Sequence, residues 1–91
     1  MTASNPYRST PVFDQDTLPV ALQSRHATKP GVWGRIRIIE GELELTYIEP
    51  PSRVVLDPHS PGLLLPEQAH FVTVHGPMKM QVDFYDQPPD G

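Results

Sequence analysis

Prolines occur along the whole chain and limit the folds that it can adopt. The 91 residues include 12 prolines, about 13% of the chain against an average near ~5%. Because proline lacks an amide hydrogen and fixes φ, it interrupts both helices and central strands. No segment sustains a helical pattern of apolar residues over three turns. The chain is therefore predicted to be all-β.

Alternating apolar and polar residues predict the positions of the strands. Residues 32–40 predict a strand with one apolar face, formed by Val32, Ile36 and Ile38. Arg35 and Arg37 share the other phase with Trp33 and Ile39, and the two arginines face solvent or acids on a neighbouring strand. Residues 42–48 alternate in the same way, and Glu40-Gly41 predicts a tight turn that pairs the two segments as a hairpin. The remaining predicted strands cover residues 11–13, 53–56, 63–65, 70–74 and 79–85, and a helical turn fits only within residues 16–22.

Seven or eight short strands predict one small domain, either a sandwich or a barrel. We expect the domain to cover residues 8–86, with a flexible segment at residues 1–7 and a disordered tail at residues 87–91. The chain has no cysteine, which excludes disulfides and thiolate metal sites.

Composition also restricts location and partners. The longest apolar runs are far shorter than the ~20 residues of a membrane span, and residues 1–11 lack the layout of a signal peptide. We expect a cytoplasmic protein without membrane contact. The net charge is −4, and the basic residues between Arg25 and Arg37 are interleaved with apolar ones instead of forming a patch, so nucleic acid is not an expected partner.

Generic enzyme motifs are missing, including glycine-rich phosphate loops, dinucleotide fingerprints, HExxH and GxSxG. The sequence therefore leaves open whether the chain is an enzyme.

His70 is the most unusual residue in the pattern, because it shares the apolar phase of Val72 and Val74. It is either a buried neutral histidine bonded to the backbone or a metal ligand. Glu67 lies three residues earlier in a turn, where its carboxylate can approach the imidazole or cap the backbone. Asp83 lies in the phase that faces away from the core and becomes a fourth oxygen ligand only in a strongly curved sheet.

Three further residues have both a structural and a functional interpretation. His26, taken alone, is more often a surface histidine. Trp33 is expected in the core or in a dimer contact, with lining of a ligand pocket as the second interpretation. Lys29, in a loop, is either solvated or placed to hold an anionic ligand.

Together these segments resemble the tellurite-resistance TehB/YeaR-like domain family, a branch of the small cupins. The resemblance rests on the segments His-x-Thr-Lys-x-Gly-x-Trp from His26 to Trp33 and Pro-Glu-x-x-His from Pro66 to His70, and it extends over about residues 8–85. It implies a cupin-type jelly-roll β-barrel, a homodimer and a metal site inside the barrel. The general cupin motif has a second histidine where this chain has Thr28 and a glutamate where it has Gly34.

The resemblance implies His26 and His70 as the principal metal ligands, with Glu67 as a third and Asp83 as a fourth. Zinc is the first choice of divalent transition metal, with iron, nickel and manganese as alternatives. We consider three hypotheses: a metal-binding cupin that handles tellurite, another oxyanion or another chemical stress; a non-catalytic module that holds an anion near Lys29 and Arg25; and a dimeric interaction domain whose histidines belong to the core.

Overall fold

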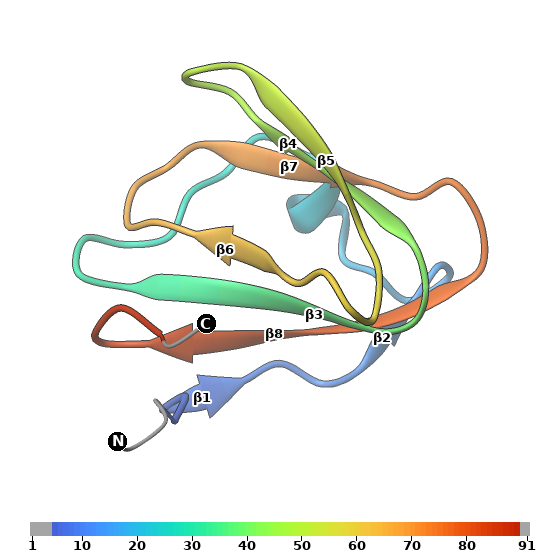
Figure 1. Ribbon diagram of the computed structural model, residues 1–91, viewed down its shortest axis with the longest axis horizontal. Coiled ribbons are helices and arrows are strands. Elements are labelled where there is room, and N and C mark those ends of the chain that lie inside the picture. Colours follow the sequence, from blue (N-terminus) through green and yellow to red (C-terminus); the bar gives the residue numbers. More distant parts are fainter. Residues whose placement is uncertain (1–4, 90–91) are drawn as a thin grey trace.

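A computed structural model describes residues 5–89, which fold as two facing β-sheets (Figure 1). The larger sheet has the strand order β1-β8-β3-β6, with β2 also paired to β8. The smaller sheet has the order β5-β4-β7. All neighbouring strands run antiparallel, and a short 3-10 helix, η1, is the single helical element of the described residues.

The longer strands lie close to the segments that alternation predicts, whereas alternation predicts no strand at residues 8–9, which form β1. The larger sheet contains β1 (Arg8–Ser9), β2 (Phe13–Asp14), β3 (Trp33–Gly41), β6 (Gly62–Leu64) and β8 (Met78–Tyr85), and the smaller sheet contains β4 (Leu43–Tyr47), β5 (Ser52–Leu56) and β7 (His70–Thr73), with η1 at Val20–Gln23. The all-β class and the single compact domain are confirmed. The pairings within residues 5–89 form two sheets and no closed ring of strands, so the cupin-type jelly-roll barrel stays a prediction.

The predicted pairing of residues 32–40 with residues 42–48 is wrong. β3 pairs with β6 and β8, whereas β4 belongs to the other sheet and pairs with β5 and β7. Alternation identifies the buried face of a strand but not its partner, which explains the error. Gly41, at a φ of 76°, ends β3 where the chain crosses from one sheet to the other.

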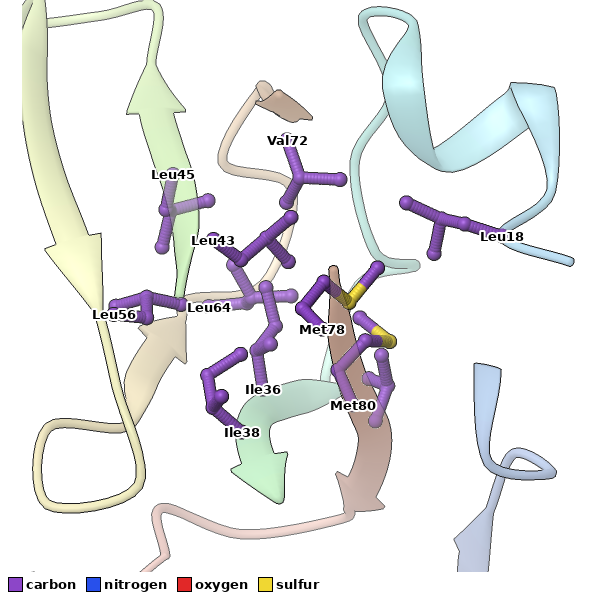
Figure 2. Packing of buried hydrophobic residues seen from close by; sticks show 11 residues of the cluster. Leu18, Ile36, Ile38, Leu43, Leu45, Leu56, Leu64, Val72, Met78 and Met80 are labelled. Atoms are coloured by element: carbon purple, nitrogen blue, oxygen red, sulfur yellow. The ribbon is translucent and has the colours of Figure 1, made fainter. Parts of the chain in front are cut away.

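The core lies between the sheets (Figure 2). Both sheets contribute aliphatic side chains on alternate positions, as expected where each sheet buries one face. The buried cluster contains Leu18, Ile36, Ile38, Leu43, Leu45, Leu56, Leu64, Val72, Met78, Met80 and Val82. This core fills one part of the space between the sheets and leaves a cavity in another part.

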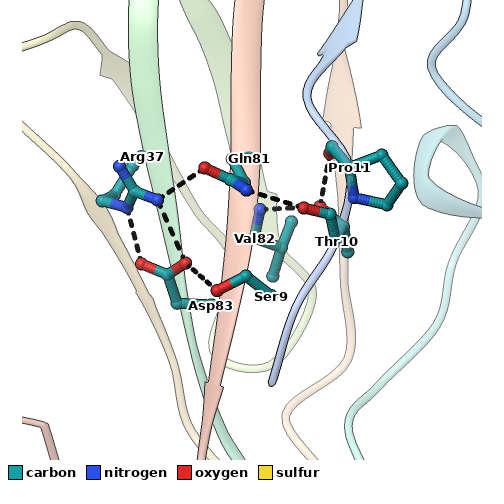
Figure 3. A network of polar contacts seen from close by, with 7 residues as sticks. All are labelled: Ser9, Thr10, Pro11, Arg37, Gln81, Val82 and Asp83. Carbon is teal, nitrogen blue, oxygen red and sulfur yellow. Dashed lines mark hydrogen bonds and ion pairs between the residues drawn. The ribbon is translucent and has the colours of Figure 1, made fainter. Parts of the chain in front are cut away.

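A polar network covers the opposite face of the larger sheet (Figure 3). Arg37 on β3 donates from Nε to Oδ2 of Asp83 on β8 at 2.6 Å and from Nη2 to Oε1 of Gln81 at 2.6 Å. Ser9 on β1 donates to Oδ1 of Asp83 at 2.6 Å. The network joins three adjacent strands, and it confirms that Arg37 faces an acid on a neighbouring strand.

The predicted terminal segments are described only in part. Residues 1–4 and 90–91 lie outside the described residues, so the flexibility expected for residues 1–7 and 87–91 stays a prediction. Within residues 5–89, no helix has the length and hydropathy needed to cross a bilayer.

The crossing at Gly41 provides a test of the fold. A Cβ at this position would overlap the carbonyl oxygen of Pro77 and would also meet Cα of Met78 at 3.0 Å. Gly41→Ala therefore combines backbone strain with a clash against the main chain, and we expect it to lower the free energy of unfolding in urea by about 1–3 kcal/mol or more.

Two other glycines separate these effects. Gly31 has the same φ of 76° but open space around its Cβ position, so Gly31→Ala measures strain alone. Gly76 has neither feature, and Gly76→Ala is the neutral control. Equal losses for Gly41→Ala and Gly31→Ala would contradict the clash at the crossing.

Candidate functional site

A cavity of about 280 Å³ opens between the two sheets next to the core. Its walls come from the inner faces of β3, β6, β7 and β8, together with η1, the loop of residues 26–32 and the first described residues. The lining residues are Tyr7, Arg8, Leu22, His26, Ala27, Thr28, Lys29, Val32, Ile36, Leu64, His70, Val72, Met80, Val82 and Phe84. Most of this surface is apolar, with a few polar side chains, which is typical of a small-molecule site.

The loop that carries His26 is attached to β7 through the main chain. The amide of His26 donates to the carbonyl of His70 at 3.0 Å, and the amide of His70 donates back to the carbonyl of His26 at 2.9 Å. Two residues later, the hydroxyl of Thr28 donates to the carbonyls of Val32 at 2.8 Å and Leu65 at 3.2 Å. These bonds hold the loop over one wall of the cavity.

The structure brings His26 and His70 together. Their ring centroids lie 4.2 Å apart, with an angle of 62° between the ring planes. Each Nδ1 lies close to a backbone carbonyl two residues earlier in the chain, at 2.9 Å for His26 and Ser24 and at 2.8 Å for His70 and Gln68. His70 is only 1% exposed, and its buried Nε2 has no hydrogen-bond partner among the described residues.

Burial determines the protonation of His70. Removal from water lowers the pKa of the imidazole below its ordinary value of 6.5, and the neighbouring His26 lowers it further, against the opposing effect of the Gln68 carbonyl. The neutral ring is therefore the stable form of His70 in the folded protein near neutral pH.

The other predicted metal ligands do not join the histidine pair. Glu67 is exposed at a φ of 63°, and its amide donates to the carbonyl of Thr28 at 3.1 Å. Asp83 lies on the outer face of the larger sheet, bound by Arg37 and Ser9. Its burial raises the pKa of the carboxyl, but the hydrogen bonds from Arg37 and Ser9 outweigh this and lower the pKa overall.

The donor set can be compared with the needs of a metal ion. Two imidazoles whose Nδ1 atoms are held by backbone carbonyls are arranged as metal-bound histidines usually are. Within residues 5–89, however, no group of three or more histidine, aspartate or glutamate side chains is placed to hold a metal ion. The residues therefore do not form the site of three or four protein ligands expected for structural or catalytic zinc.

The two predicted pocket residues differ in position. Lys29 lines the cavity, whereas Trp33 lies in the opposite phase of β3 from Ile36 and is not part of the lining. Arg8 also lines the cavity and was not identified from the sequence, because β1 has only two residues and shows no alternation. Its guanidinium lies 5.3 Å from the centre of the Phe84 ring, a cation–π contact at the cavity wall.

Charge distinguishes the cavity from the rest of the chain. The protein carries a net charge of −4, yet no acidic residue occurs in the described lining, which includes the cations Arg8 and Lys29. Both cations are exposed, and His70 is buried. The lining of the cavity thus combines two exposed cations with a buried imidazole.

The structure defines a small two-sheet β domain with a cavity, and comparison with known proteins identifies its family. The model of the TehB-like domain matches residues 8–82, and the chain belongs to this family. A stretch of 51 residues, 56% of the chain, is 40% identical to the probable S-adenosyl-L-methionine-dependent methyltransferase TehB of Haemophilus influenzae strain Rd and covers 18% of that protein. The TehB of strain 10810 is 31% identical over 51 residues.

Solved structures show the same fold. The crystal structure of TehB from Haemophilus influenzae aligns with a TM-score of 0.80 and 26% identity, over 91% of this chain and 31% of that one. A crystal structure of a protein from Escherichia coli K12 aligns with a TM-score of 0.83 and 21% identity, over 97% of this chain and 95% of that one, which shows the fold alone. The chain thus spans less than a third of the TehB proteins that it matches.

The buried histidine predicts how stability depends on pH. Because the pKa of His70 is lower in the folded state than in the unfolded state, the unfolded chain binds the additional proton as the pH falls below 6.5. We expect the contribution of His70 to be complete above this value and to be lost as the pH falls through its lowered folded pKa.

The measurement is urea unfolding from about pH 7 to about pH 5 for the wild type and for His70→Phe, which has a ring of similar size that does not titrate. The stability of the variant should depend less steeply on pH. Identical slopes would show that His70 is not held neutral by burial. The contribution of Asp83 is lost only below its ordinary pKa of 3.8 and does not interfere.

Proposed function

We propose that this chain is a small-molecule-binding module of the TehB-like family, whose cavity accepts a small anion with an apolar body. The observation that carries the proposal is the cavity lining, which combines two cations with aliphatic side chains and contains no acid among the described residues. A carboxylate or oxyanion would lie against Lys29 and Arg8, while apolar atoms would contact Val72, Val82 and their neighbours.

The family suggests a role for such binding. The relatives named TehB are probable S-adenosyl-L-methionine-dependent methyltransferases. We propose that this module serves a response to tellurite or to another chemical stress. The described residues form antiparallel sheets, a setting unlike the parallel-strand crevices where dinucleotide and related cofactors bind in α/β folds. We therefore assign recognition of the stress compound or its product to this module, and not S-adenosylmethionine binding.

A binding experiment tests the charge of the cavity. Heptanoate represents an organic anion, and sodium tellurite represents an inorganic oxyanion. We expect isothermal titration calorimetry to show binding of at least one anion, with an affinity that falls at higher ionic strength and falls about tenfold in Lys29→Ala and in Arg8→Ala.

Arg53→Ala is the matched control, because Arg53 is an exposed cation on β5 that lies outside the cavity lining and makes only a 3.8 Å contact with Glu44. It should bind as the wild type does. Heptanoate without tellurite would identify an organic ligand, and tellurite without heptanoate would identify an oxyanion. If neither anion binds, or if all three variants lose affinity equally, the proposal fails.

A second candidate function is binding of a divalent transition metal by His26 and His70, completed by ligands from outside the described residues. The anchored Nδ1 atoms favour it, because they leave Nε2 of both rings as the coordinating nitrogens. Zinc is the first choice, followed by iron, nickel and manganese.

Elemental analysis of the purified protein tests the metal site. Metal bound near one equivalent in the wild type should be lost in His26→Ala and in His70→Ala and retained in His75→Ala, whose imidazole binds Glu44 outside the cavity. The absence of metal after reconstitution with each ion would exclude this second function without affecting the first.

A further inference from the structure

The two histidines of the cavity have a defined tautomer, set by their backbone contacts. A carbonyl oxygen can only accept a hydrogen bond, so the Nδ1 atoms that face Ser24 and Gln68 must both carry their protons. In a neutral imidazole the other nitrogen then has a free lone pair. His70, which burial keeps neutral, therefore offers Nε2 as a hydrogen-bond acceptor, and the same tautomer of His26 would offer its own Nε2.

Nothing in the described part of the chain satisfies these acceptors. The hydrogen-bond contacts of both imidazoles within residues 5–89 are made through Nδ1 alone, and the Nε2 of His70 is buried. The nearby hydroxyl of Thr28 is already directed to the carbonyls of Val32 and Leu65. A buried acceptor without a partner is unfavourable, and a bound group that donates to it would remove this cost.

The main chain keeps the two acceptors in place. The reciprocal amide bonds between His26 and His70 fix both backbones, and the Nδ1 bonds then limit rotation of each ring. A pair of acceptors held in this way is preorganised, so a ligand would meet it without the cost of ordering side chains.

We propose that the cavity selects an anion that also carries an O–H or N–H donor, and that this donor binds Nε2 of His26 or His70. The inference rests on the proposed function and adds to it the class of ligand. The exposed cations Arg8 and Lys29 would hold the charge, and the imidazole of the half-buried His26 or of the buried His70 would hold the donor. An omega-hydroxy carboxylate has both features.

Two ligands of equal size test the proposal. Heptanoate and omega-hydroxyhexanoate have the same number of non-hydrogen atoms and differ in a terminal methyl against a terminal hydroxyl. We expect calorimetry on protein freed of metal with EDTA to show about tenfold to hundredfold tighter binding of the hydroxy acid, although it is the more polar molecule. Equal or weaker binding of the hydroxy acid would overturn the inference, while heptanoate binding alone would still support the proposed function.

Variants of the histidines then locate the acceptor. His26→Phe and His70→Phe should lose part or all of the preference for the hydroxy acid and still bind heptanoate, whereas His75→Phe, outside the cavity, should keep the preference. His26 is only half-buried, so its variant remains informative if His70→Phe does not fold. A preference that persists unchanged in His26→Phe and in any folded His70→Phe would overturn the inference.

A spectroscopic measurement needs no variant. Nitrogen-15 NMR of the histidine rings distinguishes the two neutral tautomers, and the buried His70 ring should show a protonated Nδ1 and an unprotonated Nε2. Addition of the hydroxy acid should shift an Nε2 resonance in the direction of a hydrogen-bonded acceptor, and heptanoate should not. A protonated Nε2 in the free protein at neutral pH would overturn the proposal.

Discussion

The pairing of β3 with β8 is the interaction on which the rest of the structure depends. β8 is also the partner of β1 and β2, and β3 is the partner of β6, so every strand of the larger sheet pairs with one of these two. The inner face of the pair contributes Ile36 and Met80 to both the core and the cavity wall. The outer face carries the Arg37–Asp83 ion pair, which is largely withdrawn from water at its carboxylate end. One ladder thus supports an apolar surface and an ionic network on its two sides.

The two faces of this ladder explain which of the sequence-based predictions the structure confirms. Strand positions were predictable because alternation marks a half-buried strand, and His70 was recognised because a histidine interrupted an apolar face. Strand partners were not predictable, since Gly41 ends β3 at a crossing between sheets and not at a hairpin. Asp83 was correctly placed away from the core, and the same placement separates it from His70.

The candidate site was predictable only where one residue was unusual for its position. His26 and His70 lie together because two main-chain bonds join a loop to a strand, which no local pattern reveals. The loop position of Lys29 predicts a place near a ligand, whereas nothing in the sequence predicts this for Arg8, because a strand of two residues has no periodicity. The cavity itself results from the incomplete filling of the space between two sheets, and this depends on packing across long sequence separations.

Because the loop is attached to β7 through main-chain atoms, the side chains at the attachment point can change without loss of the attachment. The amide and carbonyl groups that pair His26 with His70 are common to all residues except proline, which lacks the amide hydrogen. Replacing either imidazole by another side chain of similar volume changes what the buried end of the cavity can recognise without removing the bonds that hold the loop. Under the proposed function, ligand preference can therefore evolve at these two positions while the architecture around them is inherited unchanged.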